Sequence, residues 1–149
     1  MIISFDLDDT LIAGANKFPT EKQNIFQRIL QNMLGLEKLR LGTTALFKDL
    51  RNKNHQIYIY TTSFRSLLKI KLTFLVYGLH LDFIINQKVH NEQVGQQNKK
   101  CSKYPPTFGI DIHIDDSLGV RMEGEKYNFK TIIIAGNDPD WIKTVLANL

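Results

Sequence analysis

The chain of 149 residues has one cysteine, Cys101, few prolines and glycines, and no long run of apolar residues. A single cysteine excludes an internal disulfide and a zinc site built from several thiolates, and it fits a reducing compartment. No segment approaches the ~20 apolar residues that a membrane-spanning helix needs. Acidic residues follow Met1 closely, unlike the basic start of a secretory signal. We therefore expect a cytoplasmic protein without membrane contact.

Acidic residues are scarce in the middle of the chain. The net charge is +4, but residues 17–103 hold fifteen Lys and Arg against five Asp and Glu, whereas residues 1–16 and 104–149 are both acidic. This asymmetry favours a positive rim around a negative pocket, which would attract anions. Lysines spread over solvated helix surfaces are the alternative.

Five short apolar segments alternate with helical patterns. Each is rich in β-branched or aromatic residues and mostly apolar on both faces, as in a parallel sheet that is covered on both sides. The alternation predicts an α/β fold, with a doubly wound five-stranded parallel sheet in a single domain, 1–149. The expected strands are 2–6, 56–61, 81–85, 110–115 and 131–135.

Helix boundaries can be predicted from capping residues. Thr20 with Gln23 has the spacing of a capping box before an amphipathic helix that starts near Ile25. Three further helices are expected: one after Gly42, one from 64 to a C-cap at Gly78, and one that starts at Asp138 and Pro139.

One segment is expected to be loosely ordered. It is the polar stretch 87–103.

Polar residues end three of the expected strands: Asp6 the first, Thr61 the second, and Asp115 with Asp116 the fourth. The carboxyl ends of parallel strands meet at one edge of the sheet, where ligands bind in such folds. Asp6, Asp8 and Asp115 would repel one another there unless a cation lay between them. Carboxylate oxygens suit a hard divalent ion, so Mg²⁺ is the expected cofactor.

These groups are suited to phosphoryl transfer. An ionised aspartate beside phosphorus can act as nucleophile and form an aspartyl-phosphate. A second carboxylate can protonate the leaving oxygen and later activate water. A hydroxyl such as that of Thr61, together with a lysine, would hold the equatorial oxygens, where charge accumulates.

The motif order resembles that of the haloacid dehalogenase (HAD) superfamily: FDLDDTL, a strand that ends in Thr, a lysine, and IDDS, spread over nearly the whole chain. The resemblance implies that Asp6 is the nucleophile and a metal ligand. It makes Asp8 the general acid and base, which also offers its main-chain carbonyl to Mg²⁺, and lets Asp115 complete the metal site. Supporting roles fall to Thr10, which would steady the loop, to Thr61 with Thr62 or Ser63 as alternatives for binding phosphate, and to Asp116.

The lysine departs from the family pattern. In most relatives it opens a helix before the fourth strand, but Lys103 lies only twelve residues before Asp115, too few for a helix and a strand. An extended, proline-stiffened descent from Lys103 to Gly109 would cover about 19 Å at ~3.1 Å per residue. The strand back to Asp115 would cover about 16.5 Å at ~3.3 Å per residue, so the two residues can meet. The alternatives are Lys88, Lys99 and Lys100.

Segments 12–40 and 87–102 are expected to be short insertions near the active site, too short for a separate cap domain. In this superfamily an uncapped site often implies a bulky or macromolecular substrate. The basic middle segment favours a phosphorylated nucleic-acid end or a nucleotide. A phosphoprotein or a small phosphorylated metabolite is the alternative.

The sequence thus predicts a Mg²⁺-dependent phosphomonoester hydrolase, and two other classes are the alternatives. A receiver-like phospho-acceptor domain lacks an acid and base in the place of Asp8. A non-catalytic phosphate-binding module would be expected to have lost Asp6 or Asp8. His113 shares a strand face with Asp115, and we expect a packed histidine with a hydrogen-bonded partner rather than a metal ligand.

Overall fold

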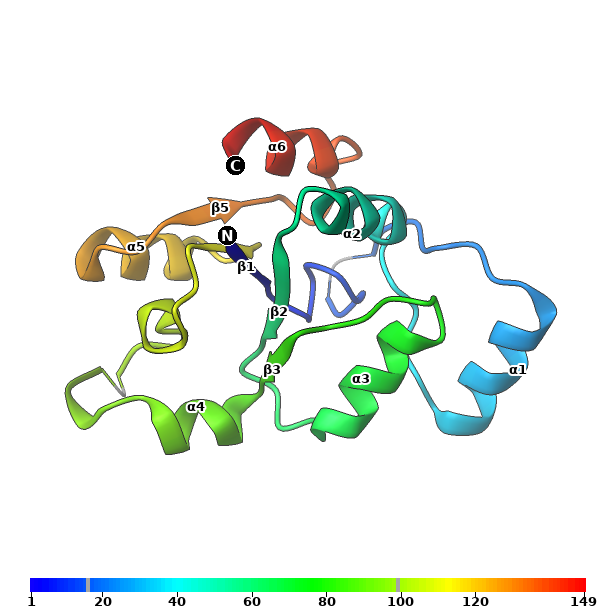
Figure 1. Ribbon diagram of the computed structural model, residues 1–149, viewed down its shortest axis with the longest axis horizontal. Coiled ribbons are helices and arrows are strands. Elements are labelled where there is room, and N and C mark those ends of the chain that lie inside the picture. Colours follow the sequence, from blue (N-terminus) through cyan, green and yellow to red (C-terminus); the bar gives the residue numbers. More distant parts are fainter. Residues whose placement is uncertain (16, 99) are drawn as a thin grey trace.

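The computed structural model describes residues 1–15, 17–98 and 100–149. Its strands are β1 (Ile2–Phe5), β2 (Gln56–Tyr60), β3 (Phe83–Ile85), β4 (Ile112–Asp115) and β5 (Thr131–Ile133). They form one sheet in the order β3-β2-β1-β4-β5, and all neighbouring pairs are parallel (Figure 1). This is the predicted single α/β domain with a five-stranded parallel sheet, so the fold class is confirmed.

Each of the five predicted segments contains a strand that is one or two residues shorter than expected. The central strand β1 pairs Phe5 with Ile59 on one side and with Ile114 on the other. Because the register aligns these residues, the chain leaves β1, β2 and β4 at the same edge of the sheet. The polar residues that follow these strands are therefore brought together there.

Helices connect the strands. The connections that include α2 and α3 lead outward from β1 to β3, and the chain then crosses to β4 on the other side of β1. The helices are α1 (Ile25–Leu34), α2 (Thr43–Asn52), α3 (Leu67–Leu75), α4 (Gln87–Gln93), α5 (Leu118–Tyr127) and α6 (Trp141–Asn148), with 3-10 helices η1 (Gln96–Asn98) and η2 (Pro105–Phe108).

The predicted capping box before α1 was wrong. Asn24 caps the helix: its Oδ1 accepts from Gln27 N at 2.8 Å, and Gln27 Oε1 accepts from Asn24 N at 2.9 Å. The predicted pair has the same spacing, but Thr20 forms a β-bridge with Arg40. The capping chemistry was thus right and its position was four residues too early.

Two helix starts and one segment differ from the predictions. Helix α3 begins at Leu67, three residues later than expected. Its predicted termination at Gly78 is confirmed, because Gly78 has φ 72°, its N–H donates to Leu75 O at 2.8 Å, and Leu79 N donates to Phe74 O at 3.1 Å. Helix α6 begins after Asp140, two residues later than expected. The segment predicted to be loosely ordered contains α4, because Asn86 Oδ1 accepts from Val89 N at 3.0 Å and so caps a helix.

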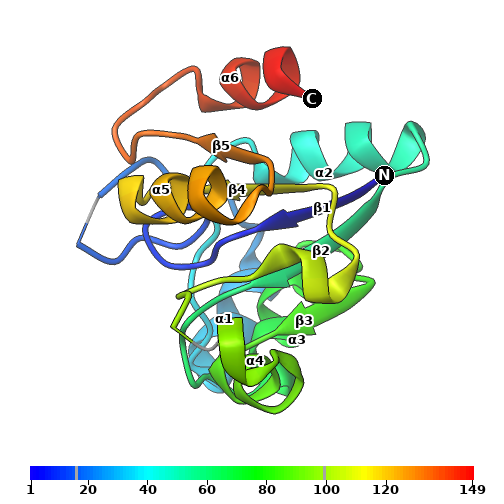
Figure 2. The same ribbon diagram turned by 90° about the vertical axis from the view of Figure 1, so that its left-hand side faces the viewer.

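The two faces of the sheet differ in composition. One face is wholly apolar, and α2, α3 and α6 pack against isoleucines of β1, β2, β4 and β5. The helices α2 and α6 lie beside each other in both views (Figures 1 and 2). The opposite face has a smaller apolar cluster around Tyr60, Ile85 and Ile110, next to α4 and η2. Ser4 and His113 are fully buried on that second face, which therefore carries polar side chains beneath the predicted site.

Helix α1 lies at the periphery beside α3 (Figure 1). Its contacts with the end of α3 are polar: Gln27 Nε2 donates to Val76 O at 3.0 Å, and Gln31 Nε2 is 3.1 Å from the Tyr77 hydroxyl. Most of its apolar side chains face solvent instead, with Phe26 72% and Met33 77% exposed. The amphipathic pattern thus predicted a helix here but not a buried face.

Among the described residues, no helix combines the length and the apolar character that crossing a membrane requires.

Candidate active site

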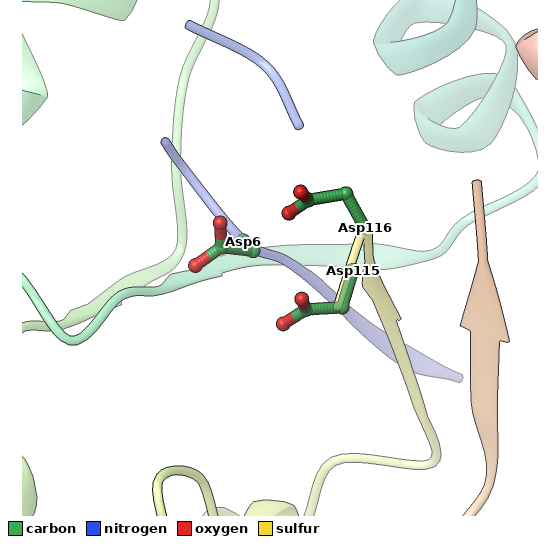
Figure 3. Close-up of side chains that lie close together, drawn as sticks. All are labelled: Asp6, Asp115 and Asp116. Carbon is green, nitrogen blue, oxygen red and sulfur yellow. The ribbon is translucent and has the colours of Figure 1, made fainter. Parts of the chain in front are cut away.

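Three carboxylates converge at the carboxyl edge of the sheet. Asp6 follows β1, Asp115 ends β4, and Asp116 comes next in the chain. Their carboxylate groups can each offer an oxygen such that these three atoms lie within 4.8 Å of one another (Figure 3). Asp6 is held in place by its backbone, whose N–H donates to Ile114 O at 2.8 Å.

Lys103 lies between two of these carboxylates. Its Nζ donates to Asp6 Oδ1 and to Asp115 Oδ2, at 2.5 Å from the latter. The route to this position differs from the predicted extended descent, because Pro105–Phe108 turn as the 3-10 helix η2. Prolines at the start of that helix fit its φ angle as well as an extended chain. The alternative lysines Lys88 and Lys100 are exposed, and Lys99 lies outside the described residues.

His113 supports this cluster from beneath. Burial lowers the pKa of His113, so the ring is neutral. Its Nε2 lies 3.0 Å from Asp115 Oδ2, and an ionised carboxylate can only accept, so Nε2 carries the proton. Nδ1 then accepts from Ser4 Oγ at 2.7 Å. His113 is thus the packed, hydrogen-bonded histidine that the sequence predicts, and its partner is a candidate metal ligand.

We call Asp6, Lys103, Asp115 and His113 the floor of the site. Burial raises the pKa of Asp6 to about 7, although the charge of Lys103 opposes the rise. Burial opposes ionisation of Asp115 too, but the hydrogen bond from His113 and the charge of Lys103 hold the pKa of Asp115 well below its usual range. Burial alone would lower the pKa of Lys103, and the two carboxylates outweigh it and raise that pKa. The metal-free floor therefore holds one firmly ionised carboxylate and one that titrates near neutrality.

The Asp8 carboxylate pairs with an arginine outside the floor. Its Oδ2 accepts from Arg65 Nη1 at 2.7 Å, and Arg65 Nε donates to Glu37 Oε1 at 3.0 Å. We call Asp8, Arg65 and Glu37 the rim. Glu37 belongs to the connection between α1 and α2, so the rim ties the loop after β1 to that connection. The structure thus brings Asp8 to the same cavity as Asp6 but leaves its carboxylate outside the carboxylate cluster.

The predicted threonines occupy different places. Thr10 is buried, and its Oγ1 donates to Asp116 Oδ1 at 3.1 Å. Thr61 is buried at the end of β2, where its Oγ1 accepts from Ser63 N at 3.0 Å. Thr62 is exposed and lines the cavity. The two adjacent hydroxyls are therefore not equivalent, because that of Thr61 organises the loop and that of Thr62 borders the site.

The cavity over the floor has a volume of about 240 Å³. Ser102 and Ser117 line it together with Asp6, Asp8 and Thr62. A larger hollow of about 710 Å³ lies along α5, β5 and α6, but none of the predicted site residues borders it. We therefore identify the smaller cavity as the candidate site, because the titratable groups converge there.

Sequence reasoning missed Arg65, Glu37 and the cavity-lining serines. Arg65 comes four residues after Thr61, in the loop that leaves a strand at the carboxyl edge, and that position was a usable signal. Glu37 carried no such signal, because its contact with Arg65 depends on how α1 packs. Asp116 was predicted to support phosphate binding, and the structure places it as the third carboxylate of the cluster.

Comparison with known proteins shows a shared fold. No protein-family model and no curated protein matches the sequence. The structure is similar to a HAD-superfamily hydrolase of subfamily IA, variant 1, from Geobacter sulfurreducens PCA. The TM-score is 0.61 with 10% sequence identity, over 99% of this chain and 98% of that one.

A second solved structure with the same type of fold is a mutant form of CbbY from Rhodobacter sphaeroides, in complex with xylulose-1,5-bisphosphate. The TM-score is 0.55 with 13% sequence identity, over 90% of this chain and 85% of that chain. The fold is therefore HAD-like along nearly the whole chain, and the predicted resemblance is confirmed at that level.

The oxygen donors of the carboxylate cluster fit Mg²⁺. Hard divalent cations take oxygen ligands, and Asp6, Asp115 and Asp116 supply carboxylate oxygens from three neighbouring positions. Burial, and after it the charge of Asp115, raises the pKa of Asp116. Bringing a cation to this cluster would relieve the repulsion.

Proposed function

We propose that the protein is a Mg²⁺-dependent phosphomonoester hydrolase that works through an aspartyl-phosphate on Asp6. The observation that carries the proposal is the position of Lys103 between Asp6 and Asp115, inside a small cavity lined by carboxylates and hydroxyls. A buried lysine beside a nucleophilic carboxylate is the arrangement that phosphoryl transfer needs, since negative charge must be neutralised without water.

In the first step Asp6 Oδ2 attacks phosphorus, while the bond from phosphorus to the leaving oxygen breaks. Asp8 gives its proton to that oxygen, so the alcohol leaves neutral. The Lys103 ammonium holds one equatorial oxygen and offsets the charge that collects there. The Thr62 hydroxyl, which borders the cavity, holds another, and Thr61 organises the loop that carries it.

In the second step a water molecule attacks the phosphorus of the aspartyl-phosphate. Asp8, now ionised, accepts the proton of that water, and the bond between phosphorus and Asp6 breaks. Inorganic phosphate and the free carboxylate of Asp6 result. Asp8 needs freedom to reach the leaving oxygen, and its half-exposed position at the rim is compatible with such movement.

Asp6, Asp115 and Asp116 would hold the metal through their side chains, with the main-chain carbonyl of Asp8 as a further ligand. Mg²⁺, when bound, would supply charge neutralisation for the phosphoryl oxygens and favour the ionised form of the nucleophile. This second effect matters because burial raises the pKa of Asp6 to about 7 in the metal-free protein.

For the substrate we infer a phosphomonoester at the end of a larger body. The cavity volume of about 240 Å³ holds a phosphate group and little more. Among the described residues, segment 12–40 supplies only α1, and segment 87–102 only α4 and η1, rather than a cap domain. The positive charge of residues 17–103 favours a phosphorylated nucleic-acid end or nucleotide over a phosphoprotein. CbbY, a fold relative, binds a sugar bisphosphate, which makes a small phosphorylated metabolite the comparison substrate.

Phosphate release tests the proposal. Wild type and Asp6→Asn are assayed with and without Mg²⁺ on an aryl phosphate, a 3′-phosphorylated oligonucleotide and a sugar phosphate. We expect turnover that needs Mg²⁺ and falls at least about a thousandfold in Asp6→Asn, because the nucleophile is lost. A preference for the oligonucleotide would support the nucleic-acid substrate.

Turnover in Asp6→Asn equal to wild type would exclude the covalent mechanism. Absence of release from all three substrates, with Mg²⁺ shown to bind by calorimetry, would favour the non-catalytic phosphate-binding module instead.

A further inference from the structure

Lys103 occupies an irregular stretch of backbone. The chain turns through residues 100–102 after the 3-10 helix η1 and continues into η2 at Pro105. No α-helix of the described chain holds this residue, so the usual i to i−4 bonds do not fix its backbone. A side chain whose Nζ must lie between two carboxylates requires a backbone that is held by something else.

A carboxylate from α5 binds this stretch. Glu123 Oε1 accepts from Ser102 N at 2.8 Å, and Glu123 Oε2 accepts from Ser102 Oγ at 2.7 Å. Lys103 N is also directed at Oε2, at 3.4 Å. One carboxylate thus accepts from three donors on two consecutive residues, and hydrogen bonds to an ionised acceptor are stronger than neutral ones.

The position of Glu123 connects this contact to the floor. Helix α5 begins directly after Asp115 and Asp116, with Ser117 as its N-cap. Glu123 lies in the second turn of the same helix, half-buried. The element that starts at the carboxylate cluster therefore also fixes the backbone that delivers the lysine to it.

The other side of Lys103 is held by a neutral group. Tyr104 N donates to the hydroxyl of Tyr60 at 2.8 Å, and that hydroxyl lies 2.6 Å from His90 Nδ1. Burial raises the pKa of Tyr60 well above its usual range, so its hydroxyl keeps its proton. Tyr60 and Glu123 thus hold the two ends of a short segment with Lys103 between them.

We propose that Glu123 is a positioning residue for the phosphate-binding lysine, and that its carboxylate takes over the role of a supporting helix by holding the backbone of Ser102 and Lys103. The expected effect on catalysis rests on the proposed function. The contact of Glu123 with Ser102 and Lys103, and its effect on the position of Lys103, do not depend on that function.

The test compares Glu123→Gln with a matched variant of the same helix. Glu125 is exposed and pairs with Arg121 at 3.1 Å, away from the Lys103 segment, so Glu125→Gln is the control. Ser102→Ala removes one of the three donors and leaves the carboxylate in place. It keeps the proposal testable if Glu123→Gln fails to fold.

Two readouts are independent of turnover. Hydrogen exchange of the Ser102 and Lys103 amides reports their hydrogen bonds to Glu123. The ¹⁵N-detected signal of the Lys103 ammonium reports its bonds to Asp6 and Asp115. We expect Glu123→Gln to speed exchange of these amides about tenfold or more and to shift or broaden the ammonium signal. Ser102→Ala should do the same to a smaller extent, and Glu125→Gln should do neither.

The catalytic readout is kcat on the aryl phosphate beside the dissociation constant for Mg²⁺. Displacement of a positioned group costs up to about a hundredfold, so we expect kcat to fall about ten- to a hundredfold in Glu123→Gln while Mg²⁺ affinity stays within about twofold. If Glu123 had a purely structural role, its substitution would lower thermal stability without lowering kcat selectively over Mg²⁺ affinity.

An unchanged ammonium signal in both Glu123→Gln and Ser102→Ala would overturn the inference, as would a wild-type kcat in a Glu123→Gln variant whose amides exchange faster. If the wild type itself releases no phosphate, the proposed function fails. The ammonium signal and amide exchange then still decide whether Glu123 positions Lys103.

Discussion

The floor and the rim of the candidate site are both built from ion pairs, but they differ in their access to water. No side chain of the floor is more than 8% exposed, whereas the side chains of the rim are between 25% and 39% exposed. The two carboxylates of the floor lie at strand ends, next to a strand-bound histidine, and Lys103 reaches them from the irregular stretch between η1 and η2. The charges of the rim lie on loops, one of which leads from a peripheral helix.

This difference predicts different energetic roles for similar contacts. Breaking a buried ion pair by removing one partner leaves an uncompensated charge and costs about 3–5 kcal/mol. A partly exposed pair contributes about 0–1 kcal/mol because water competes for both partners. The floor should therefore be rigid and intolerant of substitution, and the rim should tolerate it and move during turnover.

The largest effect is expected for Lys103→Met. The substitution removes the cation of the floor and leaves Asp6 facing Asp115. We expect kcat to fall about a thousandfold, since a charge-stabilising donor is lost, and the metal-free protein to lose about 3 kcal/mol of stability in urea unfolding. Assays of phosphate release and urea midpoints in EDTA measure both.

Lys100→Met is the matched control, because Lys100 is exposed three residues earlier in the same segment. It should change neither quantity. A loss of activity in Lys100→Met with normal activity in Lys103→Met would assign the phosphate-binding role to the alternative lysine.

A smaller effect is expected in the pH dependence of stability without metal. The pKa of Asp6 rises from 3.8 to about 7 on folding, mainly through burial. Between pH 4 and 7 the folded state thus binds a proton that the unfolded state releases, so stability falls as the pH rises through this window and levels off above it. The slope from this residue is at most about 1.4 kcal/mol per pH unit.

Asp6→Asn removes this slope. His90 and His113, whose pKa values are lowered by burial, have the opposite dependence, so the informative quantity is the difference between wild type and variant. We measure the urea midpoint of both proteins in EDTA. We expect the midpoint of Asp6→Asn minus that of wild type to rise as the pH rises from 5 to 8. Parallel curves for the two proteins would show that Asp6 ionises as easily in the folded state as in the unfolded one.

The sequence was informative about the carboxylates of the floor because backbone topology determines their positions. Alternating apolar segments predict a parallel sheet, and a parallel sheet brings Asp6 and Asp115 to one edge regardless of side-chain detail. The match of path lengths showed only that Lys103 could meet Asp115, and it left Lys88, Lys99 and Lys100 as alternatives. The extended descent on which it depended is replaced by η2.

The rim could not be predicted in this way. The link from Arg65 to Glu37 depends on where α1 packs, and the pattern of α1 indicated an apolar face without indicating what would cover it. Helix ends were uncertain for a related reason, since Thr20 and Asn24 offer the same capping chemistry four residues apart. Tertiary contacts chose between them, and a local pattern does not contain those contacts.

The smallest effect is expected for Arg65→Met at the rim. Arg65 holds the carboxylate of Asp8 in one orientation through a bond of 2.7 Å, so its loss lets that carboxylate sample more rotamers. We expect kcat on the aryl phosphate to fall about tenfold or less and stability to change by less than about 1 kcal/mol.

Arg51→Met provides the control for this last experiment. Arg51 pairs with Asp82 at 2.6 Å, and both side chains are 33% exposed. Arg51 lies near the end of α2 and Asp82 directly before β3, and neither borders the candidate cavity. The two variants should lose similar small amounts of stability, and only Arg65→Met should lose activity. If Arg65→Met instead destabilises the protein as much as Lys103→Met, the rim carries a buried charge in solution. Its ion pairs would then contribute as much to stability as those of the floor, and Asp8 would lack the freedom to move that the two-step mechanism requires.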